Sequence, residues 1–160
     1  MLSWSWGWRP AAAIALPLAV GAIGGIVTSG AIPTWYRTLV KPSWNPPDEV
    51  FGPVWILLYV AMGIALAVVL RAEGGQRRRA AVLAFAIQLS LNLAWTLVFF
   101  GLREVGLAAV IIAALWVAIV ATMDAFSRIS LAAGLLILPY LGWVSFASVL
   151  NAAVWRLNAG

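Results

Sequence analysis

The sequence contains no cysteine and no histidine, and charged residues are scarce. The chain therefore has no disulfide and no thiol nucleophile, and it lacks the usual imidazole base and a principal zinc ligand. Only 9% of the 160 residues are charged while 64% are hydrophobic, whereas soluble domains carry roughly 25% charged residues. A water-soluble surface cannot be built from so few charges. We expect no metal site, and any chemistry must come from aromatic, carboxylate and amide side chains or from a bound cofactor.

Five long apolar segments account for most of the chain. A helix needs about 20 apolar residues to cross a bilayer, so five spans nearly exhaust this length. The sequence therefore predicts an all-α fold, an integral membrane bundle of five transmembrane helices that forms a single domain over residues 1–160. The predicted helices cover residues 11–32, 50–70, 80–101, 105–123 and 129–155.

The segment between the first two predicted helices, residues 34–49, is expected to be the one long loop. It contains Pro42, Pro46 and Pro47, and proline removes a backbone donor and restricts the residue before it. The first apolar segment has an alternative interpretation as a signal peptide, because Arg9 precedes it and small residues end it. Signal peptides have an apolar core of only about 7–15 residues, so a retained helix is favoured.

Positive residues are slightly more frequent on one side of the predicted bundle. The side that holds the N-terminus has six of them, namely Arg9, Arg71, Arg77, Arg78, Arg79 and Arg128. The opposite side has four, namely Arg37, Lys41, Arg103 and Arg156. The positive-inside rule thus predicts a cytoplasmic N-terminus and an external long loop. The charges are scattered at helix ends and form no basic face, which argues against nucleic-acid binding despite the net charge of +5.

The ten tryptophans are a large excess for this length. An interfacial belt at the level of the lipid headgroups accounts for those that flank the apolar segments, namely Trp4, Trp6, Trp8, Trp35, Trp44 and Trp155. It does not account for Trp55, Trp95, Trp116 and Trp143, which fall inside the predicted helices. A buried indole needs an acceptor for its N–H group. We therefore expect some of these four side chains to face protein or ligand.

Polar and aromatic residues recur on single faces of two predicted helices. Gln88, Asn92, Trp95 and Phe99 share one face of the third helix, and Tyr140, Trp143, Ala147 and Asn151 share one face of the fifth. Amides are costly in lipid, so these faces should point inward. They could merely join helices through hydrogen bonds, or they could line a small-molecule site in the half of the bundle beneath the loop. The periodicity leaves both alternatives open.

Three blocks of sequence resemble a known family. The first is Trp35-Tyr36 followed by Lys41-Pro42-Ser43-Trp44-Asn45-Pro46-Pro47, with Phe51, Trp55 and Tyr59. The second is Gln88-Leu89, Asn92, Trp95 and Phe99-Phe100-Gly101, and the third is Pro139-Tyr140, Trp143, Phe146-Ala147 and Leu150-Asn151. In content and spacing these blocks resemble the translocator protein family (TspO/MBR), also called tryptophan-rich sensory proteins or peripheral benzodiazepine receptors.

The resemblance implies a bacterial cell-membrane protein with five helices, commonly a homodimer, that binds porphyrins such as protoporphyrin IX and haem. It also implies binding of isoquinoline carboxamides and, in some members, of sterol, with no required cofactor. Carried over by position, the ligand-binding residues would be Tyr36, Pro46, Trp55, Asn92, Trp95, Trp143 and Ala147. Trp55 and Trp143 match positions that the family associates with light-dependent porphyrin breakdown.

The favoured function is a membrane receptor or sensor for tetrapyrroles. The alternatives are a light-dependent porphyrin-degrading enzyme, and a transporter of tetrapyrroles or sterols. Transport is disfavoured because the spans lack paired charges, with only Asp124 at a helix end. Sterol binding is doubtful because no basic residue follows Tyr140 before Arg156.

The absence of histidine also bears on the form of the ligand. Haem would lack its commonest axial ligand, so a metal-free porphyrin fits the residues better. Arg37 or Lys41 in the loop would be available to a propionate. Two contacts between the protomers of a homodimer are considered. The GxxxG pair Gly21 and Gly25 would allow close approach of the first helices, whereas the resemblance implies contact through the third helix.

Overall fold

Five long helices make up most of residues 8–159, which the computed structural model describes. They are α1 (Trp8–Ala31), α2 (Asp48–Arg71), α3 (Gln76–Thr96), α4 (Val105–Ser127) and α5 (Leu131–Asn158). A short 3-10 helix, η1 (Tyr36–Thr38), lies in the α1–α2 loop, and a π-helical turn, η2 (Leu97–Gly101), continues α3. All five long helices have the length and apolar composition of membrane spans. The predicted all-α architecture is confirmed, although belt positions Trp4 and Trp6 and the side chain of Trp8 lie outside the described residues.

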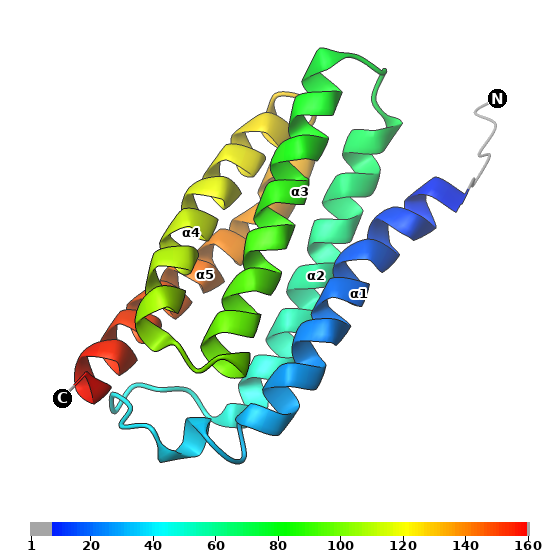
Figure 1. Ribbon diagram of the computed structural model, residues 1–160. Helices are drawn as coiled ribbons and strands as arrows, with labels where there is room; N and C mark the ends of the chain where they lie inside the picture. The colour runs from blue at the N-terminus through cyan, green and yellow to red at the C-terminus, as the bar shows by residue number, and fades with distance from the viewer. Residues whose placement is uncertain (1–7, 160) are drawn as a thin grey trace.

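The helices run alternately in opposite directions (Figure 1), so the connections gather at two ends of the bundle. Residues 34–49, the η2–α4 turn and the C-terminal end of α5 lie at one end, which we call the loop end. The start of α1, the α2–α3 connection and the α4–α5 turn lie at the other end. Helix α1 packs chiefly on α2, and α4 packs between α3 and α5. The first apolar segment is thus a packed member of the bundle.

Most helix ends extend further than the apolar segments that predicted them, although α5 begins at Leu131 instead of residue 129. Helix α3 begins at Gln76 instead of residue 80, with Arg77 and Arg79 exposed in its first turns. Helix α4 continues past Met123 to Ser127, and Arg128 donates to the Asp124 carboxylate at 2.8 Å. Hydropathy marks where lipid begins, whereas backbone hydrogen bonding continues into the polar interface, where water solvates the charged side chains.

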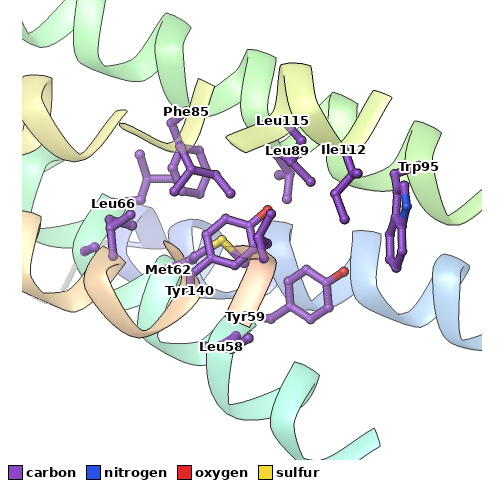
Figure 2. Close-up of a cluster of buried hydrophobic side chains, with 14 of the residues drawn as sticks. Leu58, Tyr59, Met62, Leu66, Phe85, Leu89, Trp95, Ile112, Leu115 and Tyr140 are labelled. Atoms are coloured by element: carbon purple, nitrogen blue, oxygen red, sulfur yellow. The ribbon is translucent and has the colours of Figure 1, made fainter. Parts of the chain in front are cut away.

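The predicted polar face of α3 points inward. Gln88, Asn92, Trp95 and Phe99 are 1%, 0%, 8% and 4% exposed. The Tyr59 hydroxyl donates to Asn92 Oδ1 at 2.7 Å, and Asn92 Nδ2 donates to the Tyr140 hydroxyl at 3.1 Å. Figure 2 shows Tyr59 and Tyr140 among the buried apolar side chains of the core. One amide therefore joins α2, α3 and α5.

Replacing Asn92 with leucine, which has a similar shape, should destabilise the bundle by about 2 kcal/mol. The change removes two interhelical hydrogen bonds and leaves two buried hydroxyl groups without their partner. Unfolding of the purified protein in increasing dodecyl sulfate, followed by tryptophan fluorescence, would measure the loss. Ser90→Leu is the control, because Ser90 is exposed on the same helix. Equal stability of the two variants would contradict the assigned role of Asn92.

Candidate ligand-binding cavity

A cavity of about 610 Å³ lies at the loop end of the bundle, between α1, α2, α3, η2 and α5. Its walls are mainly apolar, and small residues of α1 form one side. Eight aromatic side chains also line it, namely Tyr36, Phe51, Trp55, Tyr59, Trp95, Phe99, Phe100 and Trp143. Small-molecule sites commonly have roughly 300–1,000 Å³ and apolar, aromatic walls. In size and lining, this cavity matches such a site.

The aromatic walls are held in place by ring contacts. Trp55 stacks on Tyr59 with ring centroids 5.6 Å apart, and its centroid lies 6.3 Å from that of Trp95. Trp95 in turn contacts Phe99 at 5.7 Å. On another wall, Phe51 and Trp143 meet edge to face at 6.1 Å. These offset and T-shaped arrangements are the favoured ones for aromatic rings, so the cavity presents flat, preformed surfaces.

The π-helical turn η2 brings two consecutive phenylalanines to the cavity. Neighbouring residues of an α-helix point in directions about 100° apart, yet Phe99 and Phe100 both line the cavity. Their ring centroids are 4.7 Å apart. Single π-turns are frequent at functional sites. Phe100 was not predicted as a lining residue, because the helical periodicity used for α3 assumes a regular α-helix throughout.

The four tryptophans inside the predicted helices have different surroundings. Trp95 Nε1 donates to Asn151 Oδ1 at 3.0 Å, and Trp116 Nε1 donates to Ser145 Oγ at 2.8 Å. Trp116 is 40% exposed and lies outside the cavity. Trp143 lines the cavity, and its Nε1 atom is buried without a hydrogen-bond partner among the described residues. The Trp143 side chain thus joins the cavity wall, while its buried N–H group is left without a partner in the described part of the chain.

The structure brings most of the predicted ligand-binding residues together. Five of the seven line the cavity, namely Tyr36, Trp55, Trp95, Trp143 and Ala147. Asn92 and Pro46 are not among the lining residues. Asn92 lies fully buried in the core, where both ends of its amide are bonded to tyrosines. The Pro46 carbonyl accepts a hydrogen bond from Asn45 Nδ2 within the loop. Contact of any of the seven with a ligand stays a prediction.

The glycines of α1 form a side of the cavity that the ligand-site prediction missed. Gly21, Gly24 and Gly25 all line it. A Cβ atom on Gly21 would collide with the Tyr59 ring, and one on Gly24 would lie 3.2 Å from Thr96 Cγ2. A Cβ atom on Gly25 would meet nothing within 4 Å. Gly21 of the GxxxG pair therefore packs against α2 of the same chain, and Gly25 borders open space. Contact of this pair with a second protomer stays a prediction.

The loop covers the cavity through hydrogen bonds of its own residues. The Tyr36 hydroxyl donates to Asn45 Oδ1 at 2.9 Å. Lys41 Nζ donates to the Tyr36 carbonyl at 2.8 Å and to the Leu39 carbonyl at 3.0 Å, and it lies 4.8 Å from the centroid of the Tyr36 ring. The ammonium group that was expected to be available to a propionate is thus bonded within the loop.

Two further contacts fix the loop to the helices. Val40 N donates to Asn158 Oδ1 at 3.0 Å, and Asn158 Nδ2 donates to the Val40 carbonyl at 2.9 Å. The Arg37 guanidinium pairs with the Asp48 carboxylate at 3.3 Å. The loop is therefore held at both the end of α5 and the start of α2.

Comparison with known proteins identifies the family of this chain. The sequence model of the TspO/MBR family matches residues 13–156, which include most of α1 and all or nearly all of the other helices. The chain belongs to the TspO/MBR family. As a member with five membrane-length apolar helices, it is an integral multi-pass membrane protein.

Relatives in the TspO/MBR family span nearly the whole chain. The tryptophan-rich protein TspO of Chlorobaculum tepidum is 50% identical over 147 residues, which are 91% of this chain and 92% of that protein. The translocator protein of Homo sapiens is 40% identical over 156 residues, covering 96% and 92% of the two chains. The tryptophan-rich sensory protein of Cereibacter sphaeroides is 39% identical over 142 residues, covering 87% and 88%.

The tyrosine in the loop of this TspO/MBR family member should titrate late. Burial, with a smaller contribution from the Asp48 carboxylate, raises the pKa of Tyr36 to about 12. Because the pKa is raised above its ordinary value of about 10, the folded state prefers the neutral phenol. The contribution of the neutral Tyr36 phenol to the stability of the fold is therefore complete below pH 10 and is lost as the pH rises towards 12. Absorbance at 295 nm during a pH titration would follow ionisation of the tyrosines, and Tyr36→Phe should lack one of the phenols that ionise late in wild type. A normal pKa for Tyr36 in wild type would contradict its burial.

Proposed function

We propose that this protein is a membrane receptor that binds porphyrins, such as protoporphyrin IX and haem, in the cavity beneath residues 34–49. Isoquinoline carboxamides would be synthetic ligands of the same site. The proposal rests above all on the cavity of about 610 Å³ with eight aromatic side chains in its walls. A flat, conjugated macrocycle can stack on such rings. The names of the relatives, sensory protein and translocator protein, support a ligand-binding role.

Two features of the cavity favour a metal-free porphyrin over haem. Tyr36 and Tyr59, the tyrosines that line it, already donate their hydroxyl protons to Asn45 and Asn92, and no methionine is among the lining residues. The wall therefore provides no free side chain of the kinds that bind haem iron in the absence of histidine. A metal-free macrocycle needs no axial ligand and can bind by stacking on the aromatic side chains of the wall.

A titration of the purified protein with protoporphyrin IX in the dark, followed by tryptophan fluorescence, would test the proposal. Wild type should show saturable quenching. Trp143→Phe should bind roughly five- to tenfold more weakly, because the smaller ring offers less surface for stacking on the ligand. Trp116→Phe is the matched control, since Trp116 lies outside the cavity, and it should bind like wild type. Absence of saturable quenching in wild type would sink the porphyrin proposal.

A second candidate function is light-dependent porphyrin breakdown. It is favoured by the position of Trp55 and Trp143, since both indoles line the cavity. Illuminating the same complex and following the Soret band would test it, with Trp55→Phe and Trp143→Phe as variants. Loss of the band in wild type and its persistence in both variants would support an enzyme. A Soret band unchanged by light in wild type would exclude the enzyme, and the receptor would remain as the proposed function.

Placement in the bacterial cell membrane with a cytoplasmic N-terminus is part of the same proposal. Because the chain has no cysteine, a single thiol can be introduced at exposed Glu73 or at exposed Thr38, which lie at opposite ends of the bundle. A membrane-impermeant maleimide added to intact cells should label Thr38→Cys and spare Glu73→Cys. The reverse pattern would invert the orientation.

The remaining partner and transport assignments can be tested with purified protein. We propose a homodimer, which crosslinking in lipid nanodiscs would detect. Porphyrin flux across proteoliposomes equal to that of protein-free vesicles would exclude the transporter alternative.

A further inference from the structure

We call the part of the cavity that is lined by the first turn of α2 its mouth, and its charged residues are of one sign. Asp48 and Glu49, in the first turn of α2, are the only charged residues among those that line the cavity. Glu49 is exposed, and it forms no ion pair among the described residues. A cavity that is otherwise uncharged therefore has two carboxylates in its lining.

Three of the four positive side chains at the loop end have other partners, and the fourth, Arg156, does not line the cavity. Arg37 pairs with Asp48 and offsets one of the two carboxylates. Lys41 is bonded to loop carbonyl groups, and the Arg103 guanidinium lies 6.0 Å from the centroid of the Trp35 ring. None of the three lines the cavity. The carboxylate of Glu49 is thus the uncompensated charge at the mouth.

We propose that Glu49 makes this cavity select its ligand by charge, favouring flat aromatic ligands whose groups at the mouth are neutral or cationic over ligands that place carboxylates there. The inference rests on the proposed function, because it assumes that the cavity is the ligand site. The cavity, with its aromatic walls, provides the binding surface, and Glu49 sets which charge can enter. A porphyrin diacid is ionised at neutral pH, because carboxyl groups titrate near pH 4. Like charges at a partly apolar mouth repel, although water and salt screen an exposed group.

The effect can be isolated with three ligands that share one macrocycle. These are protoporphyrin IX with two carboxylates, its neutral dimethyl ester, and its diamide with an amine-terminated side chain, which carries two positive charges. Their affinities would be measured by tryptophan quenching in nanodiscs of zwitterionic phosphatidylcholine, at about 20 mM and about 500 mM salt. At these concentrations the Debye length changes from over 20 Å to under 5 Å. We expect wild type to bind the diamide most tightly and the diacid most weakly at low salt, with the differences reduced at high salt.

Two variants test whether Glu49 is the cause. Glu49→Gln should raise the affinity for the diacid relative to the ester by about threefold at low salt, and Glu49→Lys by about tenfold. An unchanged affinity for the neutral ester in both variants shows that the cavity is intact. The matched controls are Glu104→Gln and Glu104→Lys, because Glu104 is an exposed acid at the same end that does not line the cavity. These should leave the ratio within about twofold of wild type.

The outcomes separate this inference from the proposed function. Binding of all three porphyrins with a diacid-to-ester ratio that Glu49 does not change would overturn the charge selection and leave the porphyrin receptor standing. An equal shift from the Glu104 variants would also overturn it, because the general field of the loop end would then be responsible. Failure of every porphyrin to bind wild type would overturn the proposed function and, with it, this inference.

Discussion

Gly25→Leu is expected to abolish ligand binding while leaving the fold intact. Gly25 lines the cavity, and a Cβ atom there would meet nothing within 4 Å. A leucine side chain would therefore extend into space that a ligand needs, without displacing protein atoms. It should also favour the helix, because leucine exceeds glycine in helix propensity by up to about 1 kcal/mol. Porphyrin affinity measured by tryptophan quenching should fall about 100-fold or more, while thermal stability stays equal or rises.

Gly30→Leu is the matched control for this variant. Gly30 lies on the same helix, a Cβ atom there also meets nothing within 4 Å, and it does not line the cavity. It should bind porphyrin like wild type. Wild-type affinity in Gly25→Leu would show that the ligand binds elsewhere, and an equal loss in both variants would point to an effect on α1 as a whole.

Gly63→Val should destabilise the bundle by about 3 kcal/mol, because α1 and α2 approach closely at this position. A Cβ atom on Gly63 would lie 2.6 Å from Ile14 Cα and 3.1 Å from the Ala13 carbonyl oxygen. Backbone atoms cannot rotate away as a side chain can, so the two helices must separate. Overpacking of this kind typically costs about 1–3 kcal/mol, and more where the backbone has to move. Unfolding in dodecyl sulfate would measure the change.

Gly142→Val controls for the helix propensity of valine. Gly142 is exposed on α5, and a Cβ atom there meets nothing within 4 Å. The difference between the two variants then reports the crossing of α1 and α2 alone. A difference below about 1 kcal/mol would mean that α1 can move away from α2 without a loss of stability, which would contradict the prediction.

Hydropathy was sufficient to predict the number and order of the helices. A bilayer offers no hydrogen-bond partners to the backbone, so each apolar segment of sufficient length is forced to be helical. The helix ends were less predictable, as the start of α3 at Gln76 and the end of α4 at Ser127 show. Charged residues at the border of the lipid are solvated by water, so their helical and non-helical conformations differ little in free energy.

The candidate site was predictable only in part. Helical spacing indicated that Trp95 and Asn151 face the interior, and the structure joins them by a hydrogen bond. The same spacing could not separate Trp95, which lines the cavity, from Asn92, which lies one turn deeper in the core. Phe100 was missed because η2 departs from the α-helical period.

The sequence by itself determined that this protein is a five-helix membrane bundle, that its aromatic and amide faces point inward, and that it resembles the TspO/MBR family. Only the tertiary structure decided which of those side chains pair with one another and which line the cavity. Asn92 meets Tyr59 and Tyr140 across 33 and 48 residues of sequence, whereas Trp143 Nε1 meets no partner among the described residues. The physical reason is that hydropathy acts on each segment separately, while hydrogen bonds and cavities depend on how distant segments cross.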